Sequence, residues 1–180
     1  MNRKNSLLWI VIVAVILIAG KWSGQFDSVR APAPTPGAPI EGRAKITDGD
    51  SLEIAGERIR LFGIDAPEGR QQCRDKNGAE YACGREAARA LERLIGGRTV
   101  TCRMVEHDQY QRDVATCAVG GQGREQDLGD AMVRSGHARD YPRHSRGRYA
   151  AAEREAREAK RGLWAGEFEN PGTWRKREMK

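Results

Sequence analysis

The chain has 180 residues, of which 31 are Lys or Arg and 25 are Asp or Glu, so its formal net charge is +6. This length allows one domain with an appendage and excludes a large multidomain assembly. Charged residues make up 31% of the chain, which excludes a polytopic membrane protein, and the small net charge together with recurring apolar segments excludes a fully disordered chain.

The first residues form a separate apolar segment. Every residue from Leu7 to Ala19 is apolar, basic residues precede this run, and Lys21 follows it. As a helix, the uncharged stretch is about 24 Å long, close to the hydrocarbon core of a bilayer once the flanking lysines extend to the interfaces. Residues 1–22 are therefore predicted to be an uncleaved membrane anchor, and a cleaved signal peptide is the alternative.

Residues 23–42 are predicted to be a linker. Four of the seven prolines of the chain fall between Pro32 and Pro39. Proline lacks an amide donor and keeps the chain extended, so nine such residues span about 28 Å. We interpret the segment as a spacer between the membrane and a domain, with recognition by a proline-binding module as the alternative.

Residues 43–166 carry the pattern of one folded domain. Alternating apolar residues predict strands at 44–54 (interrupted by a turn at Asp48-Gly49), 58–64, 99–105 and 114–119. Helical spacing of apolar residues, with a glycine after each segment, predicts helices at 84–95, 127–135 and 149–160. Strands interleaved with three helices make an α+β domain, and a small closed barrel buries short strands without leaving edges.

The remaining residues, 167–180, form a basic C-terminal tail. Trp174 lies there among Arg175, Lys176 and Arg177. A disordered basic end is one interpretation of this tail, and a segment that contacts phosphates or lipid headgroups is the other.

Four cysteines predict two disulfides. Cys102 and Cys117 lie at equal distances from the midpoint of the expected hairpin loop, Gln109-Tyr110, so they face each other across the strand pair. Cys73 and Cys83 then remain to close the loop between them. A zinc site is the alternative, although no Cys-x-x-Cys occurs. Two disulfides agree with an exported domain.

Acidic residues and an arginine gather at turns and strand ends. Asp50 lies at a turn, and Pro67 turns the chain so that Asp65 and Glu68 return to the same side of a loop, where they can share a cation. Arg60 and Asp65 are five positions apart, so in a regular strand their side chains would point to opposite faces. The strand must therefore bend between them or end before Asp65.

Five short motifs follow one another through the domain. They are Asp-Gly-Asp at 48–50, Arg-x-x-x-x-Asp-x-Pro-Glu at 60–68, Asp-x-Tyr-x-Arg at 108–112, Met-Val-Arg-Ser-Gly at 132–136 and Gly-Leu-Trp at 162–164. In this order they resemble the staphylococcal-nuclease-like, or thermonuclease, family from about residue 43 to residue 164. Each motif alone is weak, but five in order make chance implausible. The resemblance implies a five-stranded OB-fold β-barrel with three α-helices.

The resemblance also implies a metal site. Asp50 and Asp65 match the calcium ligands of the family, and the main-chain oxygen of Ala66 is the third protein ligand. Because calcium takes six to eight oxygens, waters and a substrate phosphate complete its shell. Glu68 matches the family's glutamate, which is placed to orient or deprotonate an attacking water.

The same resemblance implies substrate contacts. Arg60 and Arg112 match the two arginines that hold the scissile phosphate, where guanidinium groups stabilise the growing negative charge. Tyr110 matches one aromatic residue that stacks a base, and Tyr141 is assigned to the second by proximity. Gln111 stands where relatives have glycine.

The predicted function is that of a calcium-dependent endonuclease. It would hydrolyse the 5′ P–O bond of DNA and RNA, leave 3′-phosphate ends, and lie on the periplasmic or extracellular face of the cytoplasmic membrane, anchored there or secreted. No protein partner is predicted. The alternative is a non-catalytic nucleic-acid-binding OB-fold module of the cell envelope; the presence of all three acids and both arginines favours the enzyme.

Overall fold

The computed structural model describes residues 37–179, except for residues 109, 111, 121 and 122. The predicted membrane anchor and most of the predicted linker lie outside these residues. Within the described ranges, no helix has the length and apolar character needed to cross a membrane.

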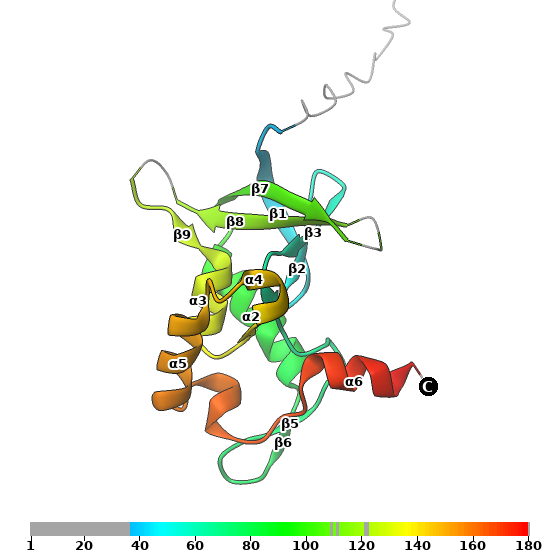
Figure 1. Cartoon of the computed structure of the whole chain (residues 1–180), viewed down its shortest axis with the longest axis vertical. Coiled ribbons are helices and arrows are strands. Elements are labelled where there is room, and N and C mark those ends of the chain that lie inside the picture. Colours follow the sequence, from blue (N-terminus) through cyan, green and yellow to red (C-terminus); the bar gives the residue numbers. More distant parts are fainter. Residues whose placement is uncertain (1–36, 109, 111, 121–122, 180) are drawn as a thin grey trace, which may run out of the picture. The chain divides into compact units, whose positions relative to one another are not determined.

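Five of the six strands of the main sheet close into a barrel (Figure 1). They are β1 (Ile40–Asp48), β2 (Ser51–Ile54), β3 (Glu57–Leu61), β7 (Thr99–His107) and β8 (Asp113–Val119). Their order is β3-β2-β1-β7-β8, and parallel pairing of β3 with β8 closes the ring, while β9 (Gln126–Asp127) extends it beside β8. The predicted five-stranded α+β barrel is confirmed.

Tight turns set the register of the first three strands. Asp48 pairs with Ser51, so Gly49 and Asp50 connect β1 to β2. Ala55 and Gly56 connect β2 to β3 with positive φ values of 54° and 92°, as a two-residue hairpin loop that follows the strand twist requires. The predicted interruption of the first strand is confirmed, although the turn lies one residue later than expected.

The first strand begins within the segment assigned to the linker. Ile40 already pairs with Cys102 of β7, so residues 40–42 belong to the barrel. The run of prolines ends at Pro39, and proline cannot donate to a strand ladder, which explains why pairing starts at the next residue.

The three predicted helices are present within two residues of their expected ends, as α2 (Cys83–Ile95), α3 (Leu128–Arg134) and α5 (Ala150–Glu158). In Figure 1 they lie together on one side of the barrel. Gly96 ends α2 in the left-handed conformation, and the Asp127 side chain caps α3 by accepting from the amide of Asp130 at 3.0 Å. Three short helices were not predicted: α4 (Pro142–Ser145), the 3-10 helix η1 (Gly162–Ala165) and α6 (Pro171–Glu178).

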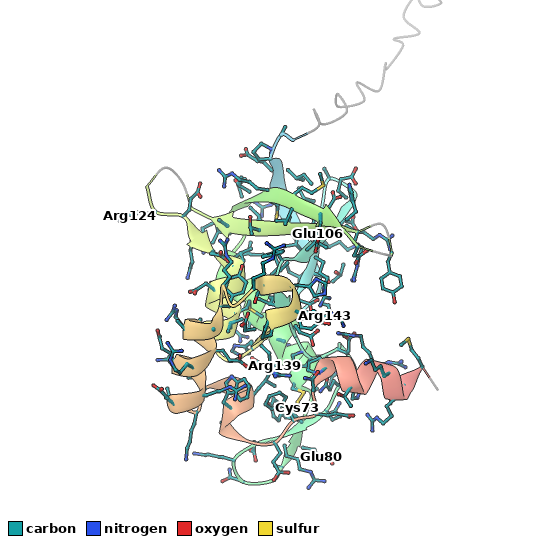
Figure 2. The ribbon with its side chains drawn as sticks, viewed as in Figure 1. Cys73, Glu80, Glu106, Arg124, Arg139 and Arg143 are labelled. Carbon is teal, nitrogen blue, oxygen red and sulfur yellow. A yellow bond between two sulfur atoms is a disulfide. The ribbon has the colours of Figure 1, made fainter. Side chains whose placement is uncertain are left out.

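Both predicted disulfides are present. Cys102 and Cys117 face each other across β7 and β8, and their bond lies in the barrel core. Cys73 and Cys83 form the second bond, beside a small hairpin of β5 (Cys73–Arg74) and β6 (Glu80–Tyr81), which Figure 2 marks with Cys73 and Glu80. Leu163 and Phe168 pack on this second disulfide.

The hairpin of β7 and β8 pairs Cys102 with Cys117 as predicted, but its loop differs from the predicted one. The expected two-residue loop is wrong, because His107 and Asp113 are the last paired residues before the loop. The register shifts by one residue between Met104 and Glu106, and this bulge restores the pairing of Cys102 with Cys117.

We expect replacement of Cys102 and Cys117 by alanine to lower the free energy of unfolding by about 3 kcal/mol, because the bond closes a loop with a sequence separation of 15. Urea denaturation measures the change. Replacing Cys73 and Cys83 is the comparison, and a smaller loss is expected because that bond closes a separation of only 10. Equal stability of the first double variant and the unmodified chain would contradict the prediction.

Candidate active site

Asp50 lies in the turn between β1 and β2 with its side chain directed into the domain. It is 4% exposed. Its carboxylate accepts hydrogen bonds from the Ser51 hydroxyl at 2.9 Å, from Arg60 Nη1 at 3.0 Å and from the amide of Ala66 at 3.2 Å. The turn fits here because Gly49 has no side chain: a Cβ at that position would lie 2.8 Å from the Cβ of Ala66.

The chain bends between Arg60 and Asp65, as predicted from their placement in one site. β3 ends at Leu61, Gly63 has a φ of +70°, and β4 (Ile64–Asp65) pairs with β10 (Arg139–Asp140) outside the main sheet. Arg60 Nη2 consequently lies 3.3 Å from Asp65 Oδ1 and 3.0 Å from Asp50 Oδ2. One guanidinium group therefore bridges the two acids assigned as calcium ligands.

Glu68 lies beyond Pro67 in a loop held by the fully buried Gln71. The side chain of Gln71 accepts from the amide of Glu68 at 3.2 Å and donates to the carbonyl of Glu169 at 2.7 Å. Gly84 of α2 packs against the same loop so closely that a Cβ there would lie 1.7 Å from the Glu68 carbonyl oxygen. These contacts place Glu68 between α2 and the C-terminal segment.

Arg175 completes the cluster, and sequence analysis did not assign it a role. Its Nη2 lies 2.8 Å from Asp65 Oδ1, and its Nη1 pairs with the Glu68 carboxylate. It belongs to α6, so most of the predicted tail is a helix and the interpretation as a disordered end is wrong. Asn170 caps α6 by accepting from the amide of Gly172 at 2.9 Å. The sequence signal was available, because Asn followed by Pro is typical of a helix start.

The cluster concentrates negative charge. Burial, followed by the charge of Asp50, raises the pKa of Asp48 to about 6. Burial alone would lower the pKa of Arg175, but its hydrogen bond to Glu68 and the charge of Asp65 outweigh burial and raise that pKa above its ordinary value. This end of the barrel thus holds more carboxylates than guanidinium groups, an arrangement that favours a bound cation.

The donor set fits calcium. Among the described residues, no group of three or more His, Cys, Asp or Glu side chains is arranged to hold a metal. The predicted set is different, because it combines two carboxylates, Asp50 and Asp65, with the carbonyl oxygen of Ala66. The amide of Ala66 donates to Asp50, which places this residue next to both acids. Oxygen-only donors suit calcium, whose shell waters can complete.

The remaining predicted residues lie outside this cluster. Arg112 Nε donates to Asp108 Oδ2 at 2.7 Å, and its guanidinium lies 5.6 Å from the centre of the Tyr110 ring, which belongs to a residue that is 61% exposed. In the part of the chain that the structure describes, no contact joins Arg112 to the acids. Gln111 lies outside the described residues. Tyr141 donates its amide to the carbonyl of Gly63 at 2.9 Å, so it flanks the bend.

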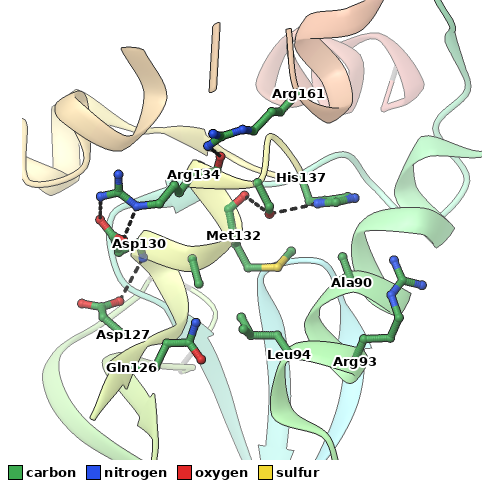
Figure 3. Close-up of a pocket in the computed structure, with 12 residues that line it drawn as sticks. Ala90, Arg93, Leu94, Gln126, Asp127, Asp130, Met132, Arg134, His137 and Arg161 are labelled. Carbon is green, nitrogen blue, oxygen red and sulfur yellow. Dashed lines mark hydrogen bonds and ion pairs between the residues drawn. The ribbon is translucent and has the colours of Figure 1, made fainter. Parts of the chain in front are cut away.

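A cavity of about 700 Å³ between α2 and α3 is not this site (Figure 3). None of the predicted site residues lines it among the residues that the structure describes. Its arginines are already occupied: Arg134 pairs with Asp130 at 3.0 Å, and Arg161 donates to the carbonyl of Arg134 at 3.1 Å. The cluster around Arg60 is therefore the candidate active site.

A family model described as staphylococcal nuclease homologue matches residues 58–166. The chain belongs to this family. The resemblance of the five motifs is thereby confirmed, as is the predicted class of enzyme, a hydrolase of the nuclease type. The matched segment of the chain contains Arg60, Asp65 and Glu68, whereas Asp50 precedes it and Arg175 follows it.

Individual relatives of the chain carry several names. The chain is 38% identical over 133 residues to the succinoglycan biosynthesis protein ExoI of Rhizobium meliloti (strain 1021), which covers 73% of this chain and 68% of that protein. It is 36% identical over 121 residues to the probable staphylococcal-like nuclease CAN3 of Oryza sativa subsp. japonica, and the alignment covers 66% of this chain and 28% of that protein. It is 37% identical over 158 residues to the probable endonuclease LCL3 of Verticillium alfalfae, and the alignment covers 79% of this chain and 53% of that protein. The match thus spans about half or less of the two nuclease-named relatives.

Proposed function

We propose that the chain is a calcium-dependent nuclease that hydrolyses phosphodiester bonds of DNA and RNA at the 5′ P–O bond and leaves 3′-phosphate ends. The observation that carries this proposal is the bridging of Asp50 and Asp65 by Arg60, because it joins cation ligands and a phosphate-binding group in one cluster. The family and the endonuclease name of the fungal relative support the same reaction class.

The residues divide the chemistry among them. Asp50, Asp65 and the carbonyl oxygen of Ala66 would hold calcium, which when bound supplies positive charge beside the phosphate oxygens. Arg60 donates to a phosphate oxygen as negative charge grows there during attack. Glu68 accepts a proton from the attacking water or orients it.

The loop between β7 and β8, together with Tyr141, supplies the other proposed substrate contacts. Arg112 gives up its hydrogen bond to Asp108 and binds the scissile phosphate. It lies directly before β8, and β8 pairs with β3, the strand that carries Arg60. Tyr110 and Tyr141 stack bases, each such contact being worth about 1–3 kcal/mol. Tyr110 suits this role because its ring is exposed.

We further propose that residues 1–22 tether the domain outside the cytoplasmic membrane. Two disulfides and no free cysteine support an oxidising compartment. Protease treatment of spheroplasts, in which the outer face of the cytoplasmic membrane is accessible, tests this location: the protease is expected to remove the domain, and complete protection would contradict the exported orientation.

We expect the full chain to degrade single-stranded DNA at mildly alkaline pH in the presence of calcium and to lose this activity in a chelator. Gel electrophoresis of the products measures cleavage, and analysis of the fragment ends is expected to show 3′-phosphates. The control is the same reaction with calcium restored after chelation. DNA binding without cleavage under all conditions would instead identify the non-catalytic binding module.

A further inference from the structure

Asp65 is enclosed in a way that the proposed calcium site does not explain. Its Oδ1 receives Arg60 and Arg175, at 3.3 Å and 2.8 Å. Its Oδ2 faces the first turn of α6, where a Cβ on Gly172 would lie 3.9 Å away. Only 4% of the residue is exposed. The carboxylate of an assigned metal ligand is therefore buried, and α6 contributes Arg175 to one of its oxygens.

The segment that carries α6 is built to hold this position. Arg74 and Glu167 exchange backbone hydrogen bonds at 2.8 Å and 2.9 Å, which joins the segment to the β5–β6 hairpin. Gln71 donates to the carbonyl of Glu169 just before the helix. Pro171, the first residue of α6, is buried. The placement of Arg175 thus follows from anchors in front of the helix, while the helix itself extends beyond them to Glu178 (Figure 1).

Arg175 and a divalent cation require the same oxygens. A guanidinium that bridges Asp65 and Glu68 occupies the space in which a metal ligand and the residue that handles the attacking water have to cooperate. A calcium ion bound to Asp65 would also add two positive charges beside Arg60 and Arg175, and like charges a few ångström apart repel strongly in a partly buried site. Binding of one cation therefore disfavours binding of the other.

We propose that Arg175 is a tethered cation that competes with calcium for Asp65 and Glu68, so that calcium binding displaces α6 from the active site. This inference rests on the proposed function, because it concerns regulation of the same metal site. It gives α6, which lies beyond the segment matched to the family, the role of a cover that opens when metal arrives.

Calcium affinity tests the competition directly. We expect Arg175→Gln to bind calcium more tightly than the unmodified full chain in isothermal titration calorimetry. If α6 covers the acids in about nine of ten molecules, the apparent dissociation constant falls about tenfold, because it equals the intrinsic constant divided by the competent fraction. Lys176→Gln is the matched control, since it removes the same charge from the same helix at an exposed position and is expected to change the affinity little.

Hydrogen–deuterium exchange of the unmodified chain gives an independent readout that needs no variant. We expect calcium to accelerate exchange of the amides of residues 172–178, while the amides of β1 and β2 keep their protection. Unchanged or slower exchange in α6 at saturating calcium would overturn displacement of the helix.

The outcomes separate this inference from the function on which it rests. Calcium binding with equal affinity in the unmodified chain and in Arg175→Gln, or tighter binding in Lys176→Gln to the same extent, would overturn the competition and leave the metal site intact. Absence of calcium binding in the unmodified chain and in every variant would overturn the metal site itself, and the inference with it.

Discussion

Arg60→Lys is expected to lower phosphodiester turnover by about 10²-fold or more while the barrel stays folded. Arg60 reaches Asp50 with both Nη1 and Nη2 and Asp65 with Nη2, and a planar guanidinium can hold both acids and still donate to a phosphate. Lysine keeps the positive charge that the buried acids need, but its single ammonium group cannot reproduce this geometry. Steady-state cleavage of single-stranded DNA measures the loss.

Lysine is a better test than alanine at this position. Arg60→Ala would leave the buried carboxylate of Asp50 without its arginine and Asp65 with Arg175 alone, and breaking a buried pair costs about 3–5 kcal/mol, so loss of folding could be confused with loss of catalysis. Arg58→Lys is the matched control, because Arg58 lies two residues earlier on β3 and is exposed. If Arg60→Lys and Arg58→Lys were equally active, Arg60 would have no role in holding the phosphate.

Asp50→Asn is expected to raise the calcium concentration needed for half-maximal activity by about 100-fold, the upper end of the loss seen when the surroundings of a metal site are altered. The change removes one of two carboxylate charges from the proposed ligand set, and calcium affinity depends on the number of such charges. The amide also cannot accept from Ser51, Arg60 and Ala66 as the carboxylate does. A calcium titration of cleavage measures the shift.

The control for this change is Asp75→Asn. Asp75 also accepts backbone hydrogen bonds, from Asn77 at 2.8 Å and Ala79 at 2.9 Å, but it lies in the exposed β5–β6 hairpin. It is expected to leave the calcium dependence unchanged. Superimposable titration curves for Asp50→Asn and the unmodified chain would remove Asp50 from the metal site.

Local sequence patterns were sufficient for the barrel and for the bend that forms the site. β1 alternates between partly buried and exposed positions along its whole length, and such alternation is visible without any tertiary information. Arg60 and Asp65 are an odd number of positions apart, so a regular strand would direct their side chains to opposite faces. This spacing alone required a distortion between them, and Gly63 with its φ of +70° provides it. The facing pair Cys102 and Cys117 likewise followed from spacing.

Long-range contacts were beyond those patterns. α6 contains few apolar residues and no helical repeat of them, so periodicity could not show that it packs on the domain. Arg175 meets Glu68 across 107 positions and Asp65 across 110, and nothing in the local sequence of either partner indicates the other. The β7–β8 loop was misjudged for a related reason, since the bulge near residue 105 compensates for extra loop residues and leaves the cysteine spacing unchanged.

The separation of 110 positions between Asp65 and Arg175 has a consequence for biosynthesis. At about 5–20 residues per second, a ribosome that has just added Asp65 needs roughly 5–20 seconds to reach Arg175. All barrel strands precede α6 in the chain, so the strand framework can assemble during this interval while its carboxylates still lack their last counter-charge. A transcript truncated before codon 171 would therefore yield a nuclease fold in which Asp65 and Glu68 lack the charge of Arg175.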